Sequence, residues 1–370
     1  MVRSFRLGLV CILLLTLALT KVGFVNAARG VPGTPEFGIG ATLYPQGPLL
    51  KDALAMAADL NLDWVKVPVA WAVYQPDPAA PPQLESLDAV MQFALQNQID
   101  VLISITDAPA WAGTARGPDP DRAARLALAL VRRYPQTVRA VELFPGANTR
   151  AGWGSRPAAE NYFSLFSRVN EQIRATGMPV TLVAAGLQPP EKPAPEGDVD
   201  DLEFLRGLYQ QGASQVMPVI SIQYRTLTGD PLDFPDGIEY RVFRHYEEVR
   251  RVMSINSHKN GKVWITHLSL PSGTIRLPDS VYQDVNVQSN WLSQAYIQAR
   301  SQLYVGVIIG QSLNPEPEGA AEGGSSLLKF SGERHPFYSV LREMISLNNL
   351  GGATIKPGKA KEGSFLKKRP

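Results

Sequence analysis

The chain has 370 residues, of which 45% are hydrophobic, with 36 Lys and Arg against 34 Asp and Glu. This composition is typical of a folded protein and excludes disorder along the whole chain. The single cysteine, Cys11, excludes an intrachain disulfide framework and any metal centre held by several cysteines. Residues 29–350 hold 27 of the basic and 33 of the acidic side chains, and this mildly acidic body argues against nucleic-acid binding.

Residues 1–27 have the pattern of a secretory signal peptide. Two arginines precede an apolar run over residues 7–20, and the small-residue site Val-Asn-Ala follows at 25–27. The run is short for a membrane span, which needs about 20 apolar residues, although an extension to residue 25 would allow an uncleaved anchor. We therefore expect a protein that is secreted or belongs to the cell envelope, and favour cleavage after Ala27 over anchoring.

From residue 37 to residue 347, apolar runs alternate regularly with segments of helical period. The apolar runs are rich in β-branched residues, as expected of strands buried on both faces. They cover residues 37–43, 63–69, 100–106, 138–144, 179–185, 217–223, 262–268 and 304–310. The helical segments cover residues 48–60, 83–98, 119–134, 156–176, 199–211, 236–256, 283–301 and 334–347. Asp119 and Pro120 are an expected helix N-cap and first helical residue.

Eight strands alternating with eight helices predict an α/β fold, a single (β/α)8 TIM barrel over residues 28–350. The alternative is an open doubly wound sheet, which should carry a Gly-rich phosphate loop after its first strand. The sequence at 44–47, Tyr-Pro-Gln-Gly, lacks that fingerprint. The barrel is therefore favoured.

The last residues, 351–370, form a basic tail with six positive side chains and one acid. They contain little apolar material, so we expect them to be disordered. This tail and the possible N-terminal anchor are the two routes by which we expect the chain to contact a membrane.

Candidate site residues are sought at the carboxyl ends of the strands, where (β/α)8 barrels place their active sites. These positions carry aromatic rings, amides and one histidine, a combination that suits the faces and hydroxyls of sugars. The candidate substrate-binding residues are Tyr44, Trp71, Trp111, Asn148, Trp153, Gln223, Tyr224 and His267. Of four histidines, His267 alone falls on a strand end, so we expect no metal site and no cofactor.

Five segments spread over most of the chain carry a family resemblance. They are Val65–Trp71 (Val-Lys-Val-Pro-Val-Ala-Trp), Asp107–Trp111 (Asp-Ala-Pro-Ala-Trp), Arg133–Leu143, Val263–Thr266 (Val-Trp-Ile-Thr) and Ser326–Leu341. In order and spacing they resemble the retaining glycoside hydrolases of the (β/α)8 clan that includes cellulases and β-xylosidases. The resemblance implies a TIM barrel, a glycan or polysaccharide partner and a pair of catalytic glutamates.

The sequence departs from that family at both catalytic positions. The family's fourth strand ends in Trp-Asn-Glu-Pro, whose Glu is the acid/base, and the aligned position here holds Gly146. Its seventh strand ends in Thr-Glu, whose Glu is the nucleophile, and the aligned position here holds His267. Retention needs two carboxyl groups about 5–5.5 Å apart, so we expect no catalytic residues at the family positions.

Two other carboxylates are expected near the barrel mouth. Asp107 ends the third strand and is the fallback catalytic candidate, because with His267 across the mouth it would supply an Asp–His pair for proton transfer. Glu142 alternates into the barrel interior, where Lys66 lies at a similar depth. We expect these two to form a buried ion pair, since an unpaired charge there would be too costly.

Three functions follow from these observations. The favoured one is an exported glycoside-hydrolase-like barrel that binds carbohydrate but is catalytically inactive, a pseudoenzyme. The first alternative is an active glycoside hydrolase with relocated carboxylates such as Asp107. The second is a cell-envelope scaffold or protein-binding module. A continuous groove lined by Trp71, Trp111, Trp153 and Tyr224 would favour sugar binding over a scaffold.

Overall fold

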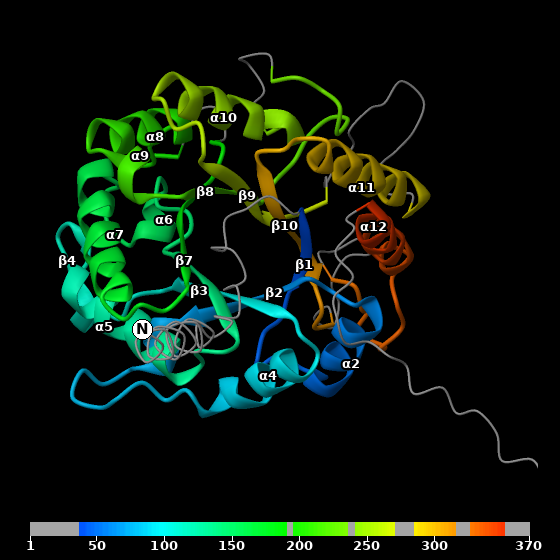
Figure 1. The fold of residues 1–370 in the computed structure, drawn as a ribbon, viewed down its shortest axis with the longest axis horizontal. Helices are drawn as coiled ribbons and strands as arrows, with labels where there is room; N and C mark the ends of the chain where they lie inside the picture. The colour runs from blue at the N-terminus through cyan, green and yellow to red at the C-terminus, as the bar shows by residue number, and fades with distance from the viewer. Residues whose placement is uncertain (1–36, 191–194, 236–240, 271–284, 316–325, 352–370) are drawn as a thin grey trace, which may run out of the picture.

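The computed structural model describes residues 37–190, 195–235, 241–270, 285–315 and 326–351. Eight parallel strands close into a barrel in the order β1-β10-β9-β8-β7-β6-β3-β2. Figure 1 shows the helices as a ring around these strands. The predicted (β/α)8 barrel is therefore confirmed, and the open sheet is excluded because β1 pairs with both β2 and β10.

The strands lie within a few residues of the predicted runs. Each is largely apolar and buried on both faces, so its position could be predicted from its composition. Their bounds are β1 Gly38–Thr42, β2 Trp64–Ala70, β3 Asp100–Thr106, β6 Val138–Leu143, β7 Thr181–Leu187, β8 Val219–Tyr224, β9 Lys262–Leu268 and β10 Val305–Ser312.

The long helices follow the strands as predicted. They are α2 Leu50–Leu60, α4 Glu85–Gln96, α5 Pro120–Arg133, α7 Ala159–Arg174, α8 Asp201–Gln210, α10 Tyr246–Ile255, α11 Val285–Arg300 and α12 Phe337–Gly351. Short elements at the loops were not predicted: α3 Trp71–Tyr74, α6 Arg150–Trp153, α9 Ala213–Val216, the 3-10 turns Ala110–Ala112 and Phe243–His245, and a hairpin of β4 Gly113–Thr114 and β5 Gly117–Pro118.

The helix predicted over residues 236–256 begins too early. Residues 236–240 lie outside the described chain, and α10 begins only at Tyr246, after the 3-10 turn. The backbone N–H of Tyr246 donates to the Tyr224 hydroxyl at 2.9 Å, and that hydroxyl donates to the Phe243 carbonyl at 2.7 Å. This buried bridge fixes a turn before the helix that apolar periodicity does not reveal.

The barrel interior changes from apolar to polar along the strands. An apolar layer lies toward their amino ends, and Trp64 and Trp264 meet there edge to face with ring centroids 5.1 Å apart. A Cβ on Gly38 would lie 2.7 Å from the Trp64 ring, so this close approach requires glycine. The layer consists of Trp64, Leu102, Ala140, Val183, Val219, Trp264, Val307 and Ile309.

Two residues further along five of these strands, the inward side chains are polar. Because strand side chains alternate, the positions that follow the apolar layer again face the interior. They are Lys66, Ser104, Glu142, Ser221 and Thr266, all at most 5% exposed. The barrel thus carries a buried polar layer directly below its carboxyl-end mouth.

Within the described chain, no helix combines the length and apolarity needed to cross a membrane. The predicted signal peptide (1–27) and nearly all of the predicted basic tail (352–370) lie outside the described residues. Both remain predictions.

Candidate functional site

The polar layer is centred on an ion pair between β2 and β6. Lys66 Nζ lies 2.9 Å from Glu142 Oε2, with both side chains buried, so the predicted ion pair is confirmed. Lys66 also donates to the Thr266 carbonyl at 3.0 Å. The carboxylate of Glu142 accepts from the hydroxyls of Ser104, at 2.7 Å, Ser221, at 3.0 Å, and Thr266.

These contacts keep Glu142 ionised despite its burial. Burial alone would raise the pKa of Glu142, but the charge of Lys66 and the hydrogen bonds from Thr266, Lys66 and Ser104 outweigh it and lower the pKa. Burial lowers the pKa of Lys66, and Glu142 opposes that effect. With four hydrogen-bond donors on its two oxygens, Glu142 is a structural carboxylate rather than a free base.

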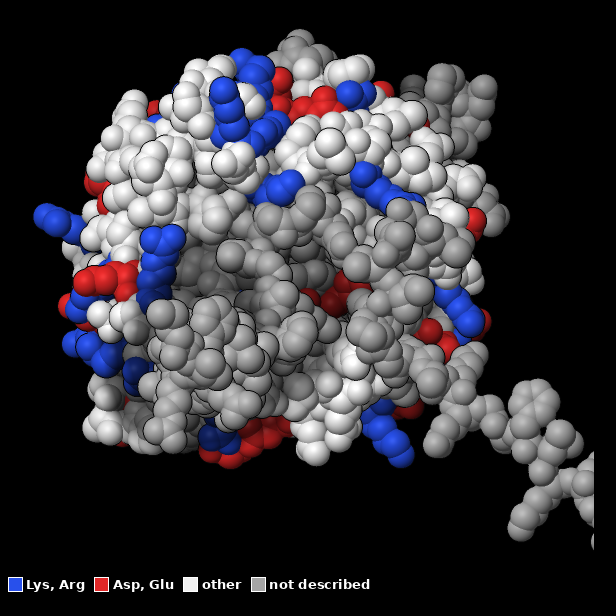
Figure 2. Space-filling view, in the orientation of Figure 1, with Lys and Arg blue, Asp and Glu red and all other residues white. Residues whose placement is uncertain are grey.

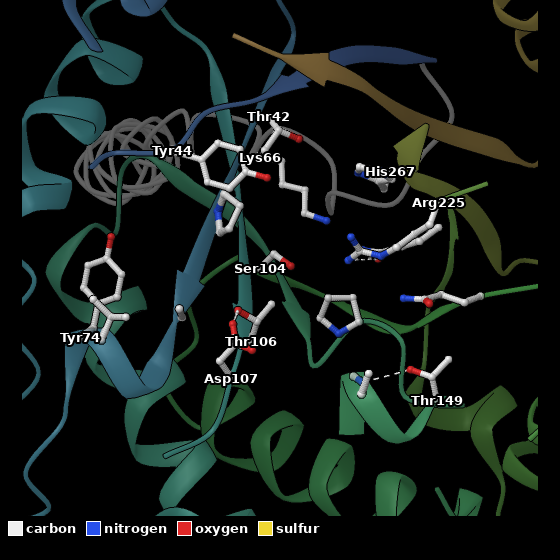
Figure 3. A pocket seen from close by; sticks show the side chains of 18 of the residues that line it. Thr42, Tyr44, Lys66, Tyr74, Ser104, Thr106, Asp107, Thr149, Arg225 and His267 are labelled. Carbon is white, nitrogen blue, oxygen red and sulfur yellow. Dashed lines mark hydrogen bonds between the residues drawn. The ribbon is translucent and has the colours of Figure 1, made fainter. Parts of the chain in front are cut away.

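Above this layer, a cavity of about 500 Å³ opens at the carboxyl ends of the strands. Figure 3 shows it with the labelled side chains pointing inward from several strands and loops. Its polar lining includes Thr42, Gln46, Lys66, Ser104, Thr106, Asp107, Thr149, Gln188, Gln223, Arg225 and His267, and its rings are those of Tyr44, Tyr74, Pro45, Pro68 and Pro145. Around the face seen in Figure 2, charges of both signs are interspersed.

Four of the predicted site residues line this cavity. Tyr44 is 47% exposed, and its backbone N–H donates to Asn314 Oδ1 at 2.7 Å, which fixes the loop after β1. Gln223 reaches the cavity from the end of β8, and its amide oxygen accepts from Arg225 at 3.1 Å. Asp107 and His267 also line it, on different sides in Figure 3.

The other predicted residues do not line the cavity. Trp71 and Trp153 are at most 2% exposed and pack against Phe144, with ring centroids 6.4 and 6.1 Å away. Trp111 packs edge to face on Trp71 and donates to the Pro76 carbonyl at 3.1 Å. The groove of tryptophans expected from the sequence is therefore not formed by these rings, because the short helical turns after β2, β3 and β6 pack them against the core.

Two further residues predicted to bind substrate instead make hydrogen bonds that stabilise the fold. Tyr224 is fully buried, and its hydroxyl holds the turn before α10 as described above. Asn148 is 1% exposed; its amide donates to the carbonyls of Gln188 and Val199, and its oxygen accepts from the Gln188 backbone N–H at 2.9 Å. These contacts tie the loop after β6 to the loop after β7.

Gly146, which the sequence resemblance aligns with an acid/base position, lies in a constrained turn after β6. Its φ of +82° falls in the region that favours glycine, and its N–H donates to the Gly186 carbonyl at 2.8 Å. A Cβ at this position would lie 2.7 Å from Gln188 Nε2. The space beside the turn is therefore occupied by an amide that itself lines the cavity.

His267, which the sequence resemblance aligns with a nucleophile position, is a neutral side chain. Burial, followed by the nearby charges of Lys66 and Arg225, lowers the pKa of His267 to about 3. Its Nε2 lies 3.0 Å from the Ser269 hydroxyl. At neutral pH this imidazole can exchange hydrogen bonds with a ligand but carries no charge.

Several lining residues were not singled out from the sequence, above all Arg225 and Gln188. Both follow a buried strand by one residue, and that position was the available signal. Thr42, Ser104 and Thr106 could have been found by continuing the inward alternation of β1 and β3. Among the described residues, no three His, Cys, Asp or Glu side chains are grouped so that they could hold a metal ion.

No protein-family model and no curated protein matches this sequence. Among solved structures, the GH39 enzyme from Xanthomonas axonopodis pv. citri has a TM-score of 0.60 at 16% identity, over 86% of this chain and 68% of that one. A monomeric beta-xylosidase from Caulobacter crescentus CB15 has a TM-score of 0.58 at 16% identity, over 84% and 68%.

A third structure, XacCel5A in complex with cellopentaose, has a TM-score of 0.54 at 12% identity, over 84% of this chain and 99% of that one. At such identities the likeness concerns the fold. It agrees with the resemblance noted in the sequence, and the chain therefore has the (β/α)8 barrel fold of glycoside hydrolases.

Proposed function

We propose that this protein is an exported, glycoside-hydrolase-like barrel that binds carbohydrate at its carboxyl-end mouth and does not hydrolyse it. One observation carries the proposal: Asp107 is the only carboxylate among the described residues that line the cavity. Both mechanisms of glycoside hydrolysis use a pair of carboxyl groups across the scissile bond. The second nearby carboxylate, Glu142, is buried behind Lys66 and held by three hydroxyls.

The positions that would hold the pair by family resemblance support the same conclusion. Gly146 has no side chain, and a longer residue there would meet Gln188 in a strained backbone conformation. His267 is an imidazole and has no carboxylate charge for attack on an anomeric carbon, and with its pKa lowered to about 3 it is not a protonated acid at neutral pH either. Neither position supplies a carboxyl group, which both mechanisms of hydrolysis use.

The cavity suits a sugar in size and in lining. A volume of about 500 Å³ is within the usual range of roughly 300–1,000 Å³ for small-molecule sites. The exposed ring of Tyr44 offers a stacking face, while Gln223 and His267 supply hydrogen-bonding groups. Similar structures include a barrel solved with cellopentaose. We therefore assign carbohydrate contacts to Tyr44, Gln223 and His267.

The test is to incubate the full chain with a panel of aryl β-glycosides and polysaccharides, measuring released product and, in parallel, the shift in melting temperature. We expect no product and a raised melting temperature with at least one sugar. Tyr44→Ala should reduce that shift, whereas Tyr304→Ala, on a ring outside the cavity lining, should not.

Three results would each contradict part of the proposal. Product formation that disappears in Asp107→Asn would favour an active hydrolase with a relocated carboxylate. No product and no sugar-dependent shift would favour the scaffold. A cell fraction that holds the chain in the cytoplasm, with residues 1–27 intact, would contradict export.

A further inference from the structure

We propose that one end of the cavity, formed by Lys66, Arg225, Gln223, His267 and Thr42, binds the carboxylate of an acidic sugar. We call this set the cationic end. The inference rests on the proposed function, because it specifies the class of carbohydrate that the cavity takes. Figure 3 shows Lys66, Arg225 and His267 grouped together, with Asp107 on another side of the cavity.

Lys66 has one hydrogen-bond donor left for a ligand. An ammonium group carries three N–H donors. One is directed at Glu142 Oε2, at 2.9 Å, and one at the Thr266 carbonyl, at 3.0 Å. Since Lys66 lines the cavity, the remaining N–H is available from that side. Glu142 already balances the charge of Lys66, so the ion pair adds donor capacity rather than net charge.

Arg225 supplies the net positive charge. Its side chain is exposed, and one terminal nitrogen donates to Gln223 Oε1 at 3.1 Å, which orients the guanidinium over the cavity. In the described part of the chain, no carboxylate lies within ion-pairing distance of it. A guanidinium presents several N–H groups in one plane, a geometry that matches the two oxygens of a carboxylate.

The two cations face the same group. Burial lowers the pKa of His267 to about 3, and the charges of Lys66 and Arg225 add to the effect. Arg225 also contributes to the lowered pKa of Lys66, after the larger effect of burial. His267 therefore stays neutral, and the cationic end keeps a net charge of about one, which a single carboxylate would balance.

Thr42 provides an independent sign of a ligand. Its side chain is 5% exposed and lines the cavity, and its hydroxyl has no hydrogen-bond partner among the described residues. It lies beside Lys66, because the two are paired across β1 and β2. A buried hydroxyl without a partner is unfavourable, and a ligand oxygen placed next to Lys66 would satisfy it.

A uronic-acid oligosaccharide fits these groups better than a neutral one. Its carboxylate would accept from Arg225 and Lys66, while its ring hydroxyls would reach Thr42, Gln223 and His267. A neutral sugar would leave the guanidinium without a counter-charge. Phosphate shares the negative charge but offers no ring hydroxyls, so competition experiments can separate the two.

The experiment is calorimetric titration of the full chain with oligogalacturonate and oligoglucuronate, each compared with its own methyl ester. The esters keep the ring and hydroxyls, replace the negative charge with a neutral carbonyl and add one methyl group. We expect at least one acid to bind about tenfold or more tightly than its ester, as a charge-assisted hydrogen bond would give. Added salt should narrow that difference, because Arg225 is exposed.

Variants test whether the difference in affinity between acid and ester arises at the cationic end. Arg225→Gln should bring the affinity for the acid down to that for the ester and leave the ester unchanged, whereas Arg225→Lys should retain part of the preference. Arg132→Gln, on the outer surface of α5, is the matched control and should bind as the unmodified chain does.

The inference and the proposed function fail in different ways. Equal binding of acid and ester, or binding of neutral glycans alone, would overturn the inference and leave carbohydrate binding intact. Displacement of the acid by inorganic phosphate at equal concentration would also overturn it, since the sugar ring would then contribute nothing. Absence of binding by acids, esters and neutral glycans alike would overturn both.

Discussion

Strand alternation predicts which single residues point into the barrel interior, but it does not predict the positions of residues that follow the strands. Glu142 and Lys66 could be paired from the sequence because each lies at an inward position in a strand of known depth. The aromatic residues that follow the strands could not be placed in this way. Trp71 starts a helical turn, and the direction of its ring depends on that turn and on Phe144, which is distant in sequence.

Removing one partner of the buried ion pair should be costly. Glu142→Gln leaves Lys66 without a counter-charge, and we expect a loss of about 3–5 kcal/mol in the free energy of unfolding. Urea unfolding at neutral pH measures this loss in the free energy of unfolding. Glu171→Gln, which removes one of the two exposed carboxylates paired with Arg168, is the control and should change stability little. An unchanged urea midpoint in Glu142→Gln would show that the pair does not hold the polar layer.

His267 should remain neutral well below the usual range for histidine. Its folded pKa of about 3 lies below the ordinary value of 6.5, so the folded state binds this proton less readily than the unfolded state. Its contribution to stability is therefore complete above about pH 6.5 and declines as the pH falls toward 3. NMR titration of the imidazole should show constant shifts from pH 8 to pH 5, and Arg225→Gln should raise the pKa. A midpoint near 6.5 would contradict this environment.

Gly146 should resist replacement by the family's glutamate. Gly146→Glu imposes a side chain on a backbone with φ +82° and places it against Gln188, so we expect a loss of about 1–3 kcal/mol and no hydrolysis. Gly154→Glu is matched, because Gly154 has φ +77° and nothing within 4 Å of a Cβ. The difference between the stability losses of the two variants, measured by urea unfolding, gives the cost of crowding against Gln188. Equal losses would mean that Gln188 moves aside freely.

At the scale of elements, capping and periodicity located helices well where the signals are local. The Asp119-Pro120 start of α5 is an example: Asp119 accepts from the Arg122 N–H at 2.9 Å, as expected of an N-cap. The start of α10 was missed because it is fixed by Tyr224, which precedes it by 22 residues and lies on another element. Local sequence rules do not include such contacts.

The cap on α5 predicts a small, specific loss of stability. Asp119→Ala leaves the first turn without its acceptor and should lower the free energy of unfolding by about 1 kcal/mol. Asp119→Asn, which keeps an acceptor oxygen, should lose much less. Thermal or urea unfolding of the two variants gives the comparison, and equal losses would indicate that the hydrogen bond is not the source.

At the scale of the whole molecule, the barrel fold could be predicted from the sequence, but only some of the side chains at the barrel mouth could be. Eight strands buried on both faces can be recognised from their composition, and the lack of a Gly-rich phosphate loop after the first strand favours a closed barrel over an open parallel sheet. The cavity depends on loops after the strands, where Arg225 and Gln188 turn inward and Trp153 turns into the core. The direction of those side chains follows from tertiary contacts, so the sequence predicted where the cavity opens but not which side chains line it.

The central claim is that this barrel holds a glycan without cleaving it. A single proton NMR experiment tests it most directly: an oligosaccharide panel that includes uronates is incubated with the full chain, with saturation transfer recorded at the start and reducing-end signals followed over time. The account predicts saturation transfer to at least one sugar and no new reducing ends. New reducing-end signals that depend on Asp107, or no saturation transfer to any sugar, would contradict it.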